Sequence, residues 1–136
     1  MADYKHAIAK VLLTEGGYVN DSADAGGETY KGIARNFWPN WTGWSVIDSA
    51  KKKDGFPANL KPRNILGDAV MNFYRTNFWD KVGGDQIASQ SIADMLVDSA
   101  VNEGIKPAVR RAQKIVLMAE TGVITPELVT KLNDLV

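Results

Sequence analysis

The chain contains no cysteine and only one histidine among its 136 residues. Without cysteine it forms no disulfide, no thiolate metal site and no cysteine nucleophile. A single histidine leaves little for a zinc site or for a Ser-His-Asp triad, which both depend on imidazole. We therefore expect neither a metal nor another cofactor. Thiol content gives no information on the compartment in which the protein works.

The sequence also lacks an excess of charge, because 16 basic residues balance 16 acidic ones. Nucleic-acid binders usually present a basic stripe, so we expect no nucleic-acid partner. No apolar run approaches the roughly 20 residues of a membrane span, and we expect no membrane insertion. Lys5, His6 and Lys10 interrupt the N-terminal apolar residues, unlike a secretory signal. We expect a monomer made in the cytoplasm without a signal peptide.

What the chain does have is helical periodicity, which predicts a mainly α fold with at most a small hairpin. From Tyr4, apolar residues fall at i, i+3, i+4, i+7 and i+8, with Asp3 as N-cap and two glycines at the end. Further helices are expected at residues 45–53, 65–79, 88–104, 107–122 and 126–135, and the lysines at 51–53 are expected to be solvated. The glycines at 83 and 84 divide two expected lobes, residues 1–84 and 85–136.

The first helix is followed by "TEGGYVNDSADAGGETYKG", which is rich in acids and glycines. On a helical wheel Glu15 lies within 20° of Tyr4, on the apolar face. It also lies at the negative end of the helix, and both this end and burial raise the pKa expected for its carboxyl group. A Glu protonated near neutral pH can act as a general acid. The alternative is a salt-bridged or solvated side chain.

The loop adds Asp21, Asp24 and Glu28. Counted from Asp21, the spacing does not fit an EF-hand. Several carboxylates near a raised-pKa Glu favour glycoside hydrolysis, whereas each acid taken alone is more simply a turn former. Three tryptophans and Phe37 follow in "NFWPNWTGW". Such rings can stack on sugars, but packing is the simpler interpretation.

Together these motifs resemble glycoside hydrolase family 108, the lysozyme-like N-acetylmuramidases. The resemblance rests on "TEGGYVND" followed by "ADAGGETYKGIA", on "NFYRTNFWDKVGGDQI", and on "IADMLVDSAVNEG" followed by "AVRRAQKIV". It implies a mainly α, lysozyme-like fold with a small loop or hairpin after the first helix. It also implies a catalytic lobe at 1–84 and a helical peptidoglycan-binding lobe at 85–136.

The resemblance further implies that Glu15 is the catalytic acid that cleaves the β-1,4 bond between N-acetylmuramic acid and N-acetylglucosamine. By a looser analogy with phage lysozymes, Asp24 or Thr29 could position water or steady the developing positive charge, and Asp21 competes with Asp24. The residues expected to bind the glycan strands are Tyr18, Asp21, Tyr30 and Asn102. A phage or prophage endolysin acting on the wall after release would fit. The alternative is a non-catalytic peptidoglycan-binding or secretion-associated module.

Overall fold

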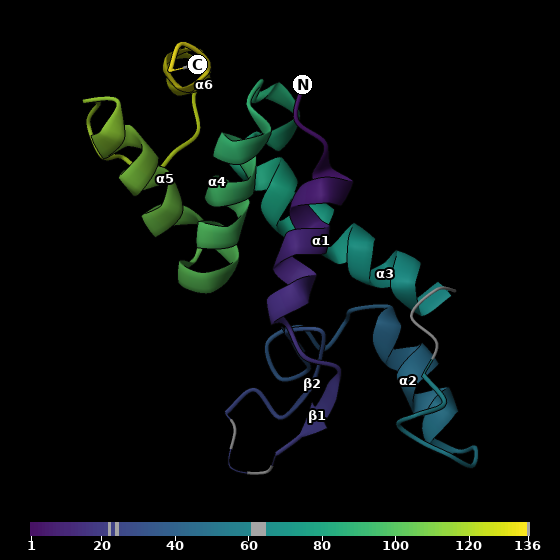
Figure 1. Ribbon diagram of the computed structural model, residues 1–136. Coiled ribbons are helices and arrows are strands. Elements are labelled where there is room, and N and C mark those ends of the chain that lie inside the picture. The colour runs from purple at the N-terminus through teal and green to yellow at the C-terminus, as the bar shows by residue number, and fades with distance from the viewer. Residues whose placement is uncertain (22, 24, 61–64, 136) are drawn as a thin grey trace. The chain divides into compact units, whose positions relative to one another are not determined.

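A computed structural model describes residues 1–21, 23, 25–60 and 65–135 (Figure 1). The chain forms two compact units, one of Leu12–Phe73 and one of Met1–Val11 with Tyr74–Val136. Helices predominate in both, which confirms the mainly α class. The separate roles assigned to residues 1–84 and 85–136 stay predictions. In the described part of the chain, no helix has the length and hydropathy to cross a bilayer.

The unit of Leu12–Phe73 contains a small antiparallel sheet, which confirms the expected hairpin. Its strands are β1 (Tyr18–Asn20), β2 (Glu28–Tyr30) and β3 (Ile33–Ala34), in the order β1-β2-β3. Tyr30 of β2 is the partner of Tyr18 on one side and of Ile33 on the other. Lys31 and Gly32 make the tight turn into β3, both with positive φ. Two helices complete the unit, α2 (Gly43–Lys51) and the main part of α3 (Ile65–Tyr74).

Aromatic rings from the segment between β3 and α2 form much of the core of this unit. Trp44 is buried, and its ring meets that of Trp41 edge-on at 5.3 Å. Trp41 also packs against Tyr30 and Phe73, and its indole N–H donates to the Ala69 carbonyl at 3.2 Å. Packing, the simpler interpretation of these tryptophans, is therefore confirmed for Trp41 and Trp44.

In the second unit, α1 (Tyr4–Thr14) begins as expected, since the Lys5 amide donates to Asp3 Oδ1 at 3.1 Å. The helix expected at 65–79 changes type: after α3, residues Arg75–Trp79 form a π-helix. Trp79 is fully buried, and its indole N–H donates to Asp85 Oδ1 at 2.8 Å. Gly83 then ends this helical stretch with a φ of 71°.

The chain continues through α4 (Gln90–Glu103), α5 (Ile105–Ile115) and α6 (Pro126–Asn133). Helices α4 and α5 pack against each other (Figure 1). The hydroxyl of Ser89 accepts from the Ile92 amide at the start of α4. Thr125 does the same for Leu128, and Pro126 occupies the first turn of α6. The start predicted for this last helix is thus confirmed.

The end predicted for the preceding helix, at Gly122, is wrong because α5 stops at Ile115. Leu117 takes a left-handed φ of 60°, which no α-helix accommodates. The segment after Leu117 folds back on α5, where the buried Gln113 side chain binds it. Gln113 Oε1 accepts from the Gly122 amide at 2.9 Å, and its Nε2 donates to Thr121 Oγ1 at 2.9 Å. A buried amide satisfied in this way outweighs continued helix propensity.

Candidate active site

Glu15 is the first residue beyond α1, one position later than the last turn in which the sequence placed it. The preceding apolar face is buried at Ala7, Ile8 and Val11, and Glu15 itself is half-buried. Among the residues that the structure describes, Glu15 forms no ion pair. Its carboxyl group therefore lies at the edge of the packed region without a charged partner among the described residues.

The strand register separates the residues of the hairpin into two faces. Tyr18 pairs with Tyr30, and Val19 pairs with Thr29. Since successive side chains in a strand point to opposite faces, Tyr18, Glu28 and Tyr30 lie on one face and Thr29 lies on the other. The Thr29 hydroxyl donates to the Gly27 carbonyl at 3.3 Å. Thr29 is thus grouped with Val19 rather than with the two tyrosines.

The remaining predicted site residues are Asp21, Asp24 and Asn102. Asp21 is exposed, and its Oδ1 accepts from the Ala23 amide at 2.9 Å, the bond of a local turn. Asp24 lies outside the described residues. Asn102 is exposed near the end of α4, in the other unit. The roles of Asp21, Asp24 and Asn102 stay predictions.

Sequence reasoning missed the strongest charged cluster of this unit, which is centred on Glu28. The Glu28 side chain is only 10% exposed and lies 2.7 Å from Lys51 Nζ. It also accepts at 2.6 Å from the Tyr18 hydroxyl and at 2.6 Å from Arg35 Nη1. Arg35 in turn donates twice to Asp48, at 2.7 and 2.8 Å. We call Tyr18, Glu28, Arg35, Asp48 and Lys51 the Glu28 cluster.

Burial acts to raise the pKa of Glu28, but the hydrogen bonds from Lys51, Tyr18 and Arg35 outweigh it and lower that pKa. The hydrogen bonds from Arg35 lower the pKa of Asp48 to about 2. Burial, followed by the hydrogen bond to Glu28, raises the pKa of Tyr18. Glu28 is therefore a fixed carboxylate at neutral pH and has no proton to donate. A carboxylate held by two cations in this way does not fit the role of general acid.

The lysines at 51–53 are exposed, as expected, but Lys51 also connects α2 to β2 through its ion pair with Glu28. Its ammonium also lies 5.9 Å from the centroid of the Tyr18 ring. No local pattern announces this contact, because Glu28 and Lys51 are separated by a sheet turn and a loop. One sequence signal could have indicated it: strand alternation places Glu28 on the same face as the buried Tyr30.

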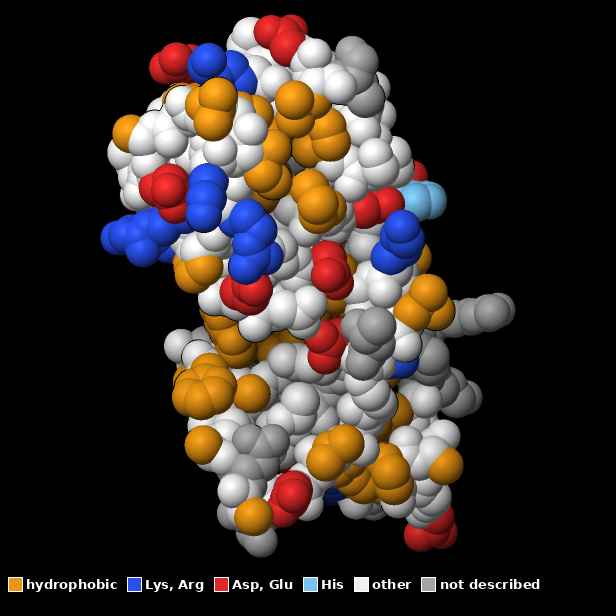
Figure 2. All heavy atoms as spheres, turned by 60° about the vertical axis from the view of Figure 1, so that its left-hand side comes forward, with side chains coloured by type: hydrophobic (Ala, Val, Ile, Leu, Met, Phe, Trp, Pro, Cys, Tyr) orange, Lys and Arg blue, Asp and Glu red, His pale blue; other side chains and the backbone are white. Residues whose placement is uncertain are grey.

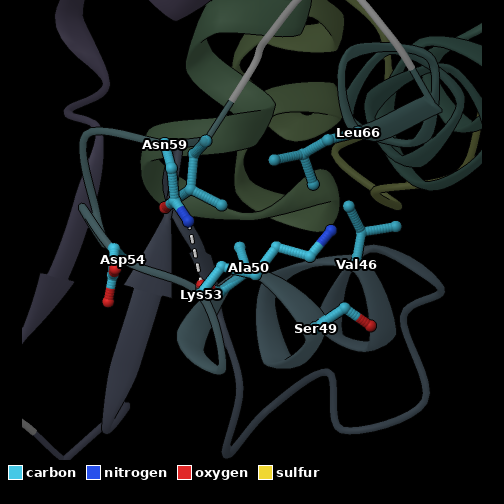
Figure 3. A pocket seen from close by; sticks show the side chains of 8 residues that line it. Val46, Ser49, Ala50, Lys53, Asp54, Asn59 and Leu66 are labelled. Carbon is cyan, nitrogen blue, oxygen red and sulfur yellow. Dashed lines mark hydrogen bonds between the residues drawn. The ribbon is translucent and has the colours of Figure 1, made fainter.

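Two hollows are lined by described residues of this unit. The first has a volume of about 380 Å³, and its lining includes both tyrosines that were predicted to bind substrate. The first lining residue along the chain, Gly17, follows Glu15 by two positions. The full lining is Gly17, Tyr18, Tyr30, Lys31, Pro57, Ala58 and Leu60. The other, of about 420 Å³, lies beside α2 (Figure 3) and involves none of the predicted site residues. Figure 3 shows the Asn59 amide at its edge, donating to the Ala50 carbonyl at 2.9 Å. No group of three or more His, Asp or Glu suited to a metal occurs among the described residues.

Comparison with known proteins assigns the class. The family model for glycosyl hydrolase 108 matches residues 8–104, and the chain belongs to that family. At the level of the family it is a glycosidase, and peptidoglycan hydrolysis is the activity that the family supports. The fold is mainly α and lysozyme-like, as the resemblance implied.

Among solved structures, that of Brucella abortus SagA is similar, with a TM-score of 0.65 and 27% sequence identity. The match covers 96% of this chain and 68% of that one. No match was found among curated proteins.

Proposed function

We propose that the chain is an N-acetylmuramidase, which cleaves the β-1,4 bond between N-acetylmuramic acid and N-acetylglucosamine with Glu15 as general acid. The observation that supports this most is the contrast between two carboxyl groups of one unit. Glu28 is ion-paired to Lys51 and Arg35, whereas Glu15 is half-buried directly after α1 without an ion pair to any described residue. A general acid needs an environment like that of Glu15, because ion pairs with cations hold a carboxyl group in its ionised form.

In the proposed reaction, the Glu15 carboxyl proton passes to the glycosidic oxygen as the bond from that oxygen to C1 breaks. The leaving sugar departs as an alcohol, and the remaining ring acquires oxocarbenium character. A water molecule or a carboxylate then bonds to C1 from the opposite face. Asp24 or Asp21 could accept the proton of that water or steady the charge, and Thr29 could orient it. The separation of the two carboxyl groups decides between inversion and retention.

Substrate contacts in this proposal come from Tyr18 and Tyr30, which line the 380 Å³ hollow close to Glu15 in the chain. Asp21 and Asn102 are assigned as further contacts on the motif match alone. The partner is the glycan strand of peptidoglycan, and the site of action is the cell wall after release from the cytoplasm.

The test is turbidity clearance of purified peptidoglycan by the wild type, Glu15→Gln and Glu120→Gln. Glu120 is exposed after α5, so its variant removes an equivalent acid away from the site. Removing a general acid costs about 10² to 10⁴ in rate, and we expect that loss only in Glu15→Gln. Product masses should show N-acetylmuramic acid at the new reducing end.

Clearance by Glu15→Gln at the wild-type rate would show that the acid is assigned wrongly. Reducing-end N-acetylglucosamine would instead show a different bond specificity. If the wild type binds walls without cutting them, and Glu15→Gln binds equally, the non-catalytic binding module is the correct function.

A further inference from the structure

Two adjacent aromatic side chains of the segment after β3 are exposed rather than packed. Phe37 is 67% exposed and Trp38 is 38% exposed, whereas Trp44 of the same segment is buried. Single hydrophobic side chains occur at several places on the molecular surface shown in Figure 2, so exposure alone does not distinguish this pair. Its distinguishing features are a backbone fixed by hydrogen bonds and an uncharged stretch of sequence around it.

The backbone of the pair is held in place by four hydrogen bonds, one of them from the Trp41 amide to the Trp38 carbonyl at 3.2 Å. The amides of Phe37 and Trp38 both donate to the Ala34 carbonyl, at 3.2 and 2.9 Å. The Trp38 carbonyl accepts from the indole N–H of buried Trp44 at 2.9 Å. The Trp38 ring also meets the buried Phe73 ring at 4.8 Å and an interplanar angle of 89°. A ligand that binds here therefore has little backbone freedom, and little freedom of the Trp38 side chain, left to remove.

The stretch of sequence that carries the pair contains no charged residue. Residues 36–47 contain no Lys, Arg, Asp or Glu, in a chain of which 24% is charged. The charged residues that flank this stretch, Arg35 and Asp48, neutralise each other through two hydrogen bonds. Asn40 and Thr42 are exposed nearby and offer neutral donors and acceptors. Such a surface fits a neutral ligand with apolar faces and hydroxyl groups, which describes a pyranose ring.

We propose that Phe37 and Trp38 form a glycan-binding platform, called here the aromatic platform, that holds sugar rings away from the cleaved bond. The proposal of a platform rests on the proposed function, because it takes Glu15 as the residue at which the glycan is cleaved. Glu15 precedes β1 by three residues and Phe37 follows β3 by three, and these are the outer strands of the sheet. The register places Glu15 and Phe37 beyond opposite ends of this sheet, within the same compact unit.

The platform is tested by binding, with cleavage removed by a Glu15→Gln background. The probes are peptide-free glycan strands from purified walls and a soluble oligomer of N-acetylglucosamine. Replacing both Phe37 and Trp38 by Ala should weaken binding about tenfold, since aromatic contacts of this kind are large in area and preformed. Ile65→Ala serves as the matched control, because Ile65 is a 74% exposed apolar residue of the same unit; its affinity should not change.

Loss of the Trp38 contact with Phe73 could also lower stability, so Phe37→Ala alone is measured with its thermal melting. Because the Phe37 ring is mostly exposed, we expect Phe37→Ala to leave the melting temperature unchanged and to weaken binding about threefold. Phe37→Trp keeps an aromatic ring at this position and should bind as tightly as the Glu15→Gln parent. Unchanged affinity in both the single and the double variant would overturn the platform, as would no measurable binding of either probe by the Glu15→Gln parent.

The two proposals can fail separately. A wild type that binds glycan through the platform but cuts nothing would overturn the muramidase assignment and leave the platform in place. A wild type that cuts walls while the platform variants bind like their parent would overturn the platform alone.

Discussion

The ammonium of Lys51 lies 2.7 Å from Glu28 Oε2, which joins the last turn of α2 to the first residue of β2. An ion pair, in addition to packing, therefore connects the hairpin that follows Glu15 to α2. Through Tyr18 and Arg35, the same carboxylate also holds β1 and the end of β3. One nearly buried acid thus sets the position of all three strands relative to α2.

We expect Glu28→Gln to lower the free energy of unfolding by about 2 to 3 kcal/mol, because it leaves Lys51 and Arg35 facing a neutral amide. The loss should be smaller than for a fully buried pair, since both cations are partly exposed. Urea denaturation measures this difference, with Glu120→Gln as control. Equal midpoints for Glu28→Gln and wild type would contradict a stabilising role for the cluster.

The same cluster should make stability depend on pH on the acid side. The folded pKa of Glu28 lies below its ordinary value of 4.5, and that of Asp48 is about 2 against an ordinary 3.8. A depressed pKa gives stability that is present above the unfolded value and is lost as pH falls through the folded one. Wild-type stability should therefore fall as the pH is lowered from 5 to 2. The double variant Glu28→Gln, Asp48→Asn should show a shallower fall; parallel curves would assign the acid sensitivity to other groups.

In the other unit, we expect Gly84→Ala to be destabilising by about 1 to 3 kcal/mol through overpacking. A methyl group at Gly84 would overlap the indole ring of Trp79. Trp79 is fully buried and tied to Asp85, so its ring has no free space to move into. Chemical denaturation tests this against Gly16→Ala, whose added methyl meets nothing within 4 Å. A Gly84→Ala protein as stable as wild type would mean that the indole shifts at little cost.

Features set by neighbours in the chain could be predicted from the sequence. The N-caps Asp3 and Thr125, the proline at 126 and the break at Gly83 all act over one or two turns, and the structure has them as expected. The end of α5 could not be predicted in the same way. It depends on the buried amide of Gln113, which bonds to a segment that folds back from eight to ten residues away.

The same distinction between local and long-range interactions applies to the candidate site. Periodicity and glycines alone predicted the apolar face of the first helix and the loop or hairpin after it, but only the structure placed Glu15 one residue beyond α1. Only the tertiary structure decided that Glu28 is a fixed carboxylate and that, within one aromatic segment, Trp44 is buried while Phe37 is exposed. The physical reason is that helix periodicity and turn chemistry act between near neighbours, whereas the ionisation of an acid and the burial of a ring depend on distant segments packed against them.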